Sequence, residues 1–432
     1  MVHSVFRGRF LHFFENPHQH GDSAWQYLED GILWVEEGHI AAFGPASNIL
    51  RKIPKSLQIR HKPEHLFLPG FVDTHVHYPQ IEMIAAYGNQ LLEWLRDYTF
   101  PVESKFADAA YARAVARRFL TELLRNGTTT ALVFCSVHKA SVDAFFQAAG
   151  QRNARMIAGK VMMDRNAPEV LLDNAEDSYT QSRELIQCWH QRGRFHYAVT
   201  PRFAPTSTPQ QLTLAARLLT EFPDLYLHTH LSENQAEIEW VKRLFPERTS
   251  YLDVYRHYGL VGPRSIFAHG IHLHDSDFAL LAHEQSALAH CPTSNLFLGS
   301  GLFDLASANQ HGIKVGLGTD IGAGTSFSML QTMAEAYKIQ QLRGATLDPL
   351  QAFYLATLGG AKALSLEHKI GNFKLGKEAD FIEINPEATP LLRFRSAHCN
   401  HLTETLFALA VLGDDRCIAA TYLLGQPQHY PD

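Results

Sequence analysis

Histidines at alternating positions are the residues of this chain best suited to bind a metal. They form four His-x-His triplets: His18/His20, His75/His77, His228/His230 and His272/His274. Neutral imidazole and carboxylate are ligands of divalent transition metals, and a bound metal can activate water near neutral pH. With 25 histidines in 432 residues, roughly one or two triplets are expected by chance, so a triplet alone is weak evidence. Which of them bind a metal depends on the elements that carry them.

Short β-rich runs alternate with helical patterns through the middle of the chain. Helical periodicity is clearest in residues 109–127, which end at a plausible glycine cap, Gly127. The β-rich runs cover residues 66–73, 128–135, 155–164, 195–203, 225–233, 265–272, 286–295 and 313–322. Eight strands alternating with helices predict an α/β fold of the (β/α)8 TIM-barrel type, whose active site lies at the carboxyl ends of the strands.

Strand position separates the four triplets. His18/His20 lies in a polar turn before the first strand, and His272/His274 lies in a loop after the sixth, so we interpret both as solvated. His75/His77 and His228/His230 end strands one and five, and alternation puts both members of a pair on one face. His230 is nearer the strand end, whereas His228 is deeper and suits a buried structural role. Further polar residues at strand ends are Arg202, Glu233, His269 and Asp320.

These strand ends predict one catalytic metal site. His75, His77 and His230 with Asp320 supply four ligands from three strands, and Glu233 is placed to move protons. His269 is expected to orient water or stabilise developing charge. Each residue also has a structural interpretation. Asp320 can cap a turn, Glu233 can favour a helix N-terminus, and His269 can be a core histidine.

Composition narrows the class of protein. The apolar share of 46% suits a large core, and a net charge of −6 without a basic stripe argues against nucleic-acid binding. The five cysteines form no Cys-x-x-Cys, which favours a reducing compartment. With no membrane-spanning run and no signal-peptide pattern, we expect a cytoplasmic protein.

The β-like segments 1–65 and 371–432 are expected to form one small β-sandwich domain beside a catalytic barrel of residues 66–370.

The motifs together resemble the amidohydrolase superfamily. The resemblance covers about residues 66 to 383 and rests on "PGFVDTHVH", "HTHLSEN", "AHG", "GLGTDIG" and "LGKEADF". It narrows to the guanine deaminase family through "HVHYPQ", "LLEWLRDYTFPVE", "NGTTTA", "TPRFAPT", "HTHLSENQAEI" and "HCPTSNLFLGSG". The superfamily implies a distorted barrel and a small β-sandwich built from both chain ends.

The resemblance also implies an activity and its residues. The activity is hydrolytic deamination of guanine to xanthine and ammonia in purine catabolism, by a metal-activated water. Metal ligation falls to His75, His77, His230 and Asp320, and catalysis to Glu233, Asp320 and His269. Gln80, Arg202 and Phe203 are implied to contact the purine, together with His230, Glu233, His269 and Asp320. Stacking on Phe203 and hydrogen bonds from Gln80 and Arg202 suit a flat, uncharged ring.

Several alternatives remain open at this stage. A binuclear hydrolase of the same superfamily needs a lysine at the end of strand four, where the chain reads "TPRF"; Lys160 lies in strand three. A deaminase of a pterin, an adenosine derivative or a triazine is the main alternative, and a non-catalytic relative is another. Zinc is the expected metal, with iron or cobalt possible. We expect a homodimer, and the apolar segment 91–100 either covers the pocket or packs as an ordinary helix.

Overall fold

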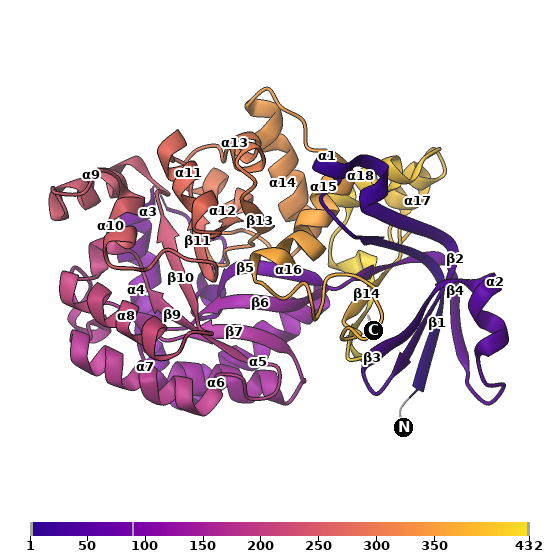
Figure 1. Ribbon diagram of the computed structural model, residues 1–432, viewed down its shortest axis with the longest axis horizontal. Coiled ribbons are helices and arrows are strands. Elements are labelled where there is room, and N and C mark those ends of the chain that lie inside the picture. The colour runs from indigo at the N-terminus through magenta and orange to yellow at the C-terminus, as the bar shows by residue number, and fades with distance from the viewer. Residues whose placement is uncertain (1–2, 89, 430–432) are drawn as a thin grey trace.

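Eight parallel strands form the larger of the two sheets in the molecule (Figure 1). The computed structural model describes residues 3–88 and 90–429. The eight strands pair in chain order, and β8 (Val161–Met162) adds a short pairing to the fourth of them. They are β5 (Phe71–His77), β6 (Thr128–Phe134), β7 (Arg155–Gly159), β9 (His196–Pro201), β10 (Tyr226–Leu231), β11 (Ser265–His269), β12 (Ala287–His290) and β13 (Lys314–Leu317).

The first and last of these strands close the ring. The backbone N–H of Asp320, just beyond β13, donates to the carbonyl of His75 at 2.9 Å, and the N–H of His77 donates to the carbonyl of Ile321 at 2.9 Å. The predicted (β/α)8 barrel is therefore confirmed. Closure places the carboxyl ends of β5 and β13 side by side, which matters for the site described below.

Amphipathic helices cover the outside of the barrel. In α5 (Ala109–Arg125) the Asp108 side chain accepts from two backbone N–H groups at the start, and Gly127 follows the end with φ +79°, as a helix-ending glycine does. The other helices of the barrel are α6 (Lys139–Gly150), α7 (Ala175–Trp189), α8 (Pro209–Glu221), α9 (Gln235–Leu244), α10 (Tyr251–His257), α11 (Asp275–His283), α12 (Pro292–Phe297), α13 (Leu305–Gln310), α14 (Met329–Leu342), α15 (Pro349–Tyr354) and α16 (Gly360–Ala363).

Shorter helices lie between β5 and α5 and in the two ends of the chain. After β5 the chain forms α3 (Leu91–Trp94), a π-helical turn at Leu95–Thr99, and α4 (Phe100–Ser104). The remaining helices are α1 (Pro17–His20), α2 (Ala46–Ile49), α17 (Pro390–Ser396) and α18 (Leu402–Leu412). Among the residues that the structure describes, no helix has both the length and the apolar character needed to cross a membrane.

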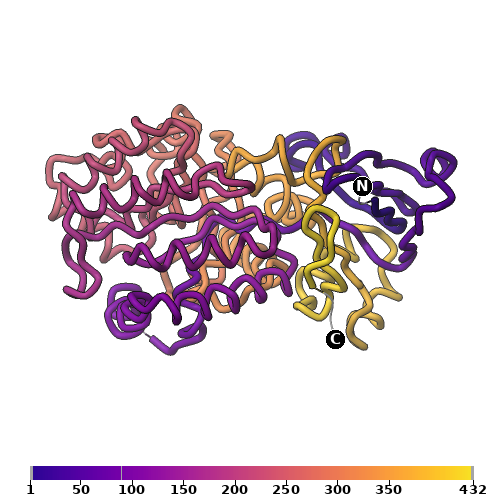
Figure 2. Tube along the Cα trace, turned by 90° about the horizontal axis from the view of Figure 1, so that it is seen from below, coloured from indigo at the N-terminus to yellow at the C-terminus, as the bar shows by residue number. Residues whose placement is uncertain are grey.

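The two ends of the chain form the second sheet, beside the barrel (Figure 2). This mixed sheet has the order β16-β15-β14-β4-β1-β2-β3, and its aromatic core includes Phe10 stacked on Phe67 at 4.8 Å and Phe381 stacked on Tyr422 at 4.4 Å. The expectation that the terminal segments join is confirmed. Its strands are β1 (His3–Phe13), β2 (Trp25–Glu36), β3 (His39–Pro45), β4 (Ile59–Pro69), β14 (Phe381–Ile384), β15 (Ile418–Leu423) and β16 (Gln426–His429).

Several of the predicted barrel strands have different bounds; the run 155–164, for example, is divided into β7 and β8, and the strand in 313–322 ends at Leu317. Residues 66–69 belong to β4 of the mixed sheet, and the first barrel strand begins only at Phe71. Gly70 separates them, because a Cβ at this position would overlap the side chain of Thr129. The run 286–295 ends as a strand at His290, and Pro292 then begins α12, where proline is favoured in the first helical turn.

Candidate metal and substrate site

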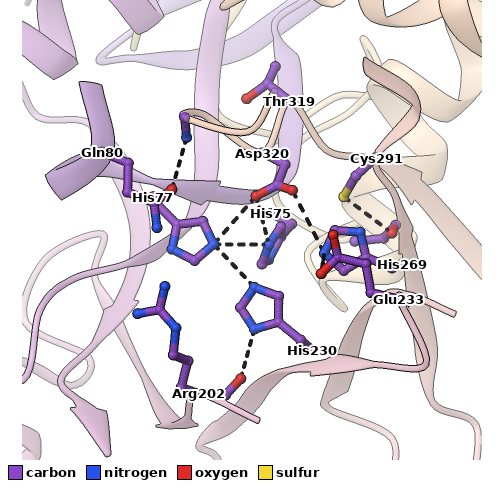
Figure 3. Close-up of polar contacts among 12 residues, drawn as sticks. His75, His77, Gln80, Arg202, His230, Glu233, His269, Cys291, Thr319 and Asp320 are labelled. Atoms are coloured by element: carbon purple, nitrogen blue, oxygen red, sulfur yellow. Dashed lines mark hydrogen bonds and ion pairs between the residues drawn. The ribbon is translucent and has the colours of Figure 1, made fainter. Parts of the chain in front are cut away.

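Three histidine nitrogens converge at the carboxyl end of the barrel (Figure 3). The Nε2 atom of His77 lies 3.2 Å from Nε2 of His75 and 3.2 Å from Nε2 of His230. His75 and His77 reach the same side of β5 because they alternate along a strand. Asp320 joins them from beyond β13, with Oδ1 at 3.2 Å from His75 Nε2 and 3.4 Å from His77 Nε2. All four side chains are buried.

Outer hydrogen bonds orient two of these rings. His230 Nδ1 donates to the backbone carbonyl of Arg202 at 2.7 Å, so the lone pair of His230 is on Nε2. His75 Nδ1 lies 2.7 Å from Nε2 of His228, which places the other nitrogen of His75 toward the cluster. A partner on the far nitrogen is the usual support of a metal-binding histidine.

The donor set fits a divalent cation. Burial lowers the pKa of His75, His77 and His230 well below the usual value, so the rings are neutral. A single proton on His77 Nε2 cannot form hydrogen bonds to two neighbouring nitrogens and an Asp320 oxygen at the same time. A cation, in contrast, can accept an electron pair from each of these atoms. Three imidazoles and a carboxylate with room for water are typical of a catalytic zinc site.

A buried carboxylate lies next to this cluster. Glu233 follows β10, and its Oε2 lies 3.4 Å from His269 Nε2. The same nitrogen is 3.7 Å from Asp320 Oδ2, while His269 Nδ1 donates to Oδ1 of Asn295 at 2.9 Å. Burial, and then the charge of Asp320, raise the pKa of Glu233 well above its usual value, so burial favours the protonated carboxyl.

Backbone strain accompanies these positions. Ser232, His269 and Asp320 all have positive φ, at 48°, 70° and 51°. Residues other than glycine avoid this region at a cost of about 1 kcal/mol or more each, and such strain gathers at functional sites. All three residues lie at or just beyond the carboxyl end of a barrel strand.

One pocket joins the cluster to the side chains expected to contact a purine. It is lined by His77, Gln80, Leu91, Trp94, Leu95, Arg202, Phe203, His230, Glu233, His269, Asp320 and Ala323. His75 lies behind this lining, fully buried. The structure thus brings together every residue that the sequence proposed for the site. It also resolves the two alternatives for the segment 91–100, because Leu91, Trp94 and Leu95 line the pocket.

Two residues that the sequence did not single out support this pocket. Glu103 accepts hydrogen bonds from Gln80 and Arg202, and Asn295 holds His269. His228, expected from the sequence to be a buried structural histidine, contacts His75. Glu103 and Asn295 stand inside motifs quoted above, "LLEWLRDYTFPVE" and "HCPTSNLFLGSG". Membership in these motifs was the one sign in the sequence that Glu103 and Asn295 matter. Which side chains they contact is determined by the fold.

Other residues considered from the sequence lie outside the pocket lining. His18 and His20 are exposed in α1. His272 is partly buried, and its Nε2 lies 2.8 Å from the Ser300 carbonyl. Lys160, the lysine weighed for a second metal, is buried and paired with Asp173.

Comparison with known proteins places this arrangement in a family. The model of the amidohydrolase family matches residues 66–427. The chain belongs to the amidohydrolase family. This amidohydrolase is 54% identical over 423 residues to a guanine deaminase of Escherichia coli (strain K12), across 97% of this chain and 96% of that protein.

Solved structures agree in fold over the whole chain. A structure of E. coli guanine deaminase matches the amidohydrolase with a TM-score of 0.97 at 53% identity, covering 99% of this chain and 100% of that one. A crystal structure of guanine deaminase from C. acetobutylicum with bound guanine in the active site matches with a TM-score of 0.89 at 29% identity, again covering 99% and 100%.

Proposed function

We propose that this chain is a guanine deaminase, which converts guanine and water to xanthine and ammonia. The observation that carries the proposal is a single pocket in which the histidine cluster and Glu233 face Gln80, Arg202 and Phe203. The 54% identity to a guanine deaminase over nearly the whole chain supports the same substrate.

His75, His77, His230 and Asp320 are the proposed metal ligands. Their converging atoms and their burial support this role. Zinc is the proposed metal because three neutral imidazoles and one carboxylate suit it. A metal held there lowers the pKa of a bound water and so supplies a nucleophile near neutral pH.

Proton transfer is proposed for Glu233, with Asp320 and His269 beside it. The raised pKa of Glu233 favours a protonated carboxyl, which can donate to the ring nitrogen next to the carbon that bears the amine. Asp320 takes one proton from the attacking water. Glu233, deprotonated by its donation to the ring, takes the remaining proton of the added hydroxyl and passes it to the amine, which leaves as ammonia when the C–N bond breaks. Asp320 then returns its proton to Glu233. His269 Nε2, 3.4 Å from Glu233, is proposed to orient the water.

Purine recognition is proposed for Gln80, Arg202 and Phe203. Phe203 offers a flat face for stacking, Gln80 a donor and an acceptor, and Arg202 a fork of N–H donors. The apolar side chains of Leu91, Trp94 and Leu95 enclose the pocket on another side and favour an uncharged ring over water.

We also propose a cellular location, an assembly state and a division into domains. We propose a role in purine catabolism in the cytoplasm, and the five free cysteines suit a reducing compartment. A homodimer is proposed because symmetric dimers are the commonest assemblies and α17 exposes Leu391 and Phe394. The division into residues 1–65 plus 371–432 and residues 66–370 stays a prediction; of these, residues 1–2, 89 and 430–432 lie outside the described residues.

Ammonia release tests the proposed activity. Zinc-loaded protein is assayed with guanine, adenine, cytosine and a pterin at equal concentrations, and kcat/KM is compared. Guanine is expected to be the best substrate by at least a hundredfold. An equal or higher kcat/KM for another of these rings would overturn the substrate proposal.

A further inference from the structure

A buried carboxylate lies behind the two polar side chains proposed to contact the purine. Glu103, in α4, is fully buried. Its Oε1 accepts from Gln80 Nε2 at 2.9 Å, and its Oε2 accepts from Arg202 Nη1 at 2.8 Å. The ring of Phe100, from the same helix, lies 5.6 Å from the Arg202 guanidinium carbon. Glu103 itself does not line the pocket.

The chemistry of Glu103 determines how the Gln80 amide is turned. A carboxylate oxygen can only accept, so the amide nitrogen of Gln80 must face Glu103. The backbone N–H of Gly322 donates to Gln80 Oε1 at 3.2 Å, which fixes the amide oxygen on the other side. The amide is therefore held in one orientation, and its second N–H is left for the pocket.

The same carboxylate balances the charge of Arg202. The Arg202 side chain is 3% exposed and that of Glu103 is 0% exposed, so water does little to screen either charge. An unpaired arginine at this place would favour a negatively charged ligand. Paired with Glu103, Arg202 offers N–H donors while the wall that they form carries no net charge.

We propose that Glu103 is a positioning residue that sets the specificity of the pocket for a neutral purine. This inference rests on the proposed deaminase function and deepens it. Glu103 fixes the donor pattern of Gln80 and Arg202, and it cancels the positive charge that would otherwise retain an anion. Because xanthine loses a proton more readily than guanine, the charge balance also favours release of the product.

Glu103→Gln tests the proposal in the zinc-loaded protein. This change keeps the shape but removes the charge and puts an NH2 group against one of the two donors. The KM for guanine is expected to rise about ten- to a hundredfold, with a smaller change in kcat, because the affected contacts lie away from the reacting carbon. Inhibition by xanthine at alkaline pH is expected to weaken less than guanine binding, or to strengthen.

Glu378→Gln is the matched control. Glu378 is also a buried carboxylate between two donors, Arg155 Nε at 2.7 Å and Arg194 Nη2 at 2.7 Å. Arg155 begins β7, at the end of the barrel opposite to the site. Glu378→Gln is expected to lower the thermal midpoint while the KM for guanine and the effect of xanthine stay at wild-type values.

The outcomes separate this proposal from the proposed activity. A wild-type protein that does not deaminate guanine overturns the activity, whereas a Glu103→Gln protein with a KM within twofold of wild type overturns the role of Glu103. A crystal structure of metal-loaded Glu103→Gln is expected to show a turned Gln80 amide or a displaced Arg202, and unchanged positions for both would also overturn it.

If Glu103→Gln does not fold, Glu103→Asp is measured instead. This variant keeps the charge but reaches only one donor, so the KM for guanine and the inhibition constant of xanthine are expected to rise together, and a wild-type KM would overturn the proposal.

Discussion

His228 Nε2 lies 2.7 Å from Nδ1 of His75, deep in the barrel, although His228 does not line the pocket. The pair joins β10 to β5 and sets the rotation of the His75 ring. One triplet therefore contains two different functions: His230 faces the cluster, whereas His228 supports a ring on another strand. His228 and His230 lie on the same side of β10 because they alternate along the strand. They differ in how deep in the barrel each ring lies.

Replacing His228 should weaken metal binding. His228→Phe removes the hydrogen bond to His75 and keeps a ring of similar size, so the affinity for zinc is expected to fall about 10- to 100-fold. Metal content after dialysis against a competing chelator measures this. His290→Phe is the control, because His290 is buried in β12, its ring stacks on Phe303, and its ring nitrogens have no hydrogen-bond partner among the described residues. Equal zinc retention by the two variants would argue against a supporting role of His228.

Glu233→Gln should abolish turnover while the metal stays bound. The amide has nearly the same shape but cannot exchange a proton between water, ring and amine. We expect kcat to fall by a factor of about 10² to 10⁴, with zinc content unchanged by elemental analysis. The exposed Glu239 on α9 provides a comparison, since Glu239→Gln should keep wild-type kcat. Full activity of Glu233→Gln would rule out its role in proton transfer.

Removing the metal should lower both activity and thermal stability. As the proposed ligands, the three histidines and Asp320 come together only in the folded barrel, so free zinc at 100 times its dissociation constant is expected to add about 2.7 kcal/mol of stability. Chelator-treated protein is therefore expected to lose ammonia release and to unfold at a lower temperature, and added zinc should restore both. A midpoint that chelation leaves unchanged would contradict a metal bound by these four residues.

The neutral state of His12 predicts a loss of stability in acid. Burial lowers the pKa of His12 from the ordinary 6.5 to about 4. His12 Nδ1 accepts from the Phe373 N–H at 3.1 Å and thus links β1 to the C-terminal part of the chain. The unfolded chain binds a proton more tightly than the folded one, so stability falls as pH drops from about 6.5 to about 4, by roughly 3 kcal/mol in full.

His12→Gln isolates this contribution from those of other buried histidines. The variant cannot take up a proton here, so its thermal midpoint should fall less between pH 7 and pH 4.5 than that of the wild type. Both proteins are measured without metal, because acid also releases a metal from histidines. Identical pH profiles would show that His12 does not titrate as its burial requires.

Much of the site was predictable because strand ends and chemistry coincide. His75, His77, His230 and Asp320 each lie near the carboxyl end of a short β-rich run, and barrel geometry brings such positions to one end. The predicted first strand begins too early, because residues 66–69 are as apolar as Phe71 although they pair with β14 in the mixed sheet.

The residues that hold the pocket side chains in place could not be predicted in the same way. Glu103 lies in a segment whose regular pattern is interrupted by a π-helical turn, and its partners, Gln80 and Arg202, are distant in sequence. Nothing in local periodicity shows that this carboxylate is buried. The same holds for the contact of His228 with His75, which depends on how deep two separate strands place their rings.

Because β5 and β13 close the barrel, the first barrel strand cannot pair with the last one until most of the chain has been synthesised. A chain still attached to the ribosome exposes His75 and His77 early and His230 later, but it has no Asp320 until the last barrel strand has emerged. The mixed sheet waits longer still, because β14, β15 and β16 are made after the barrel. The complete set of proposed ligands therefore comes together late in biosynthesis, and only a chain with a closed barrel would present all four to a metal.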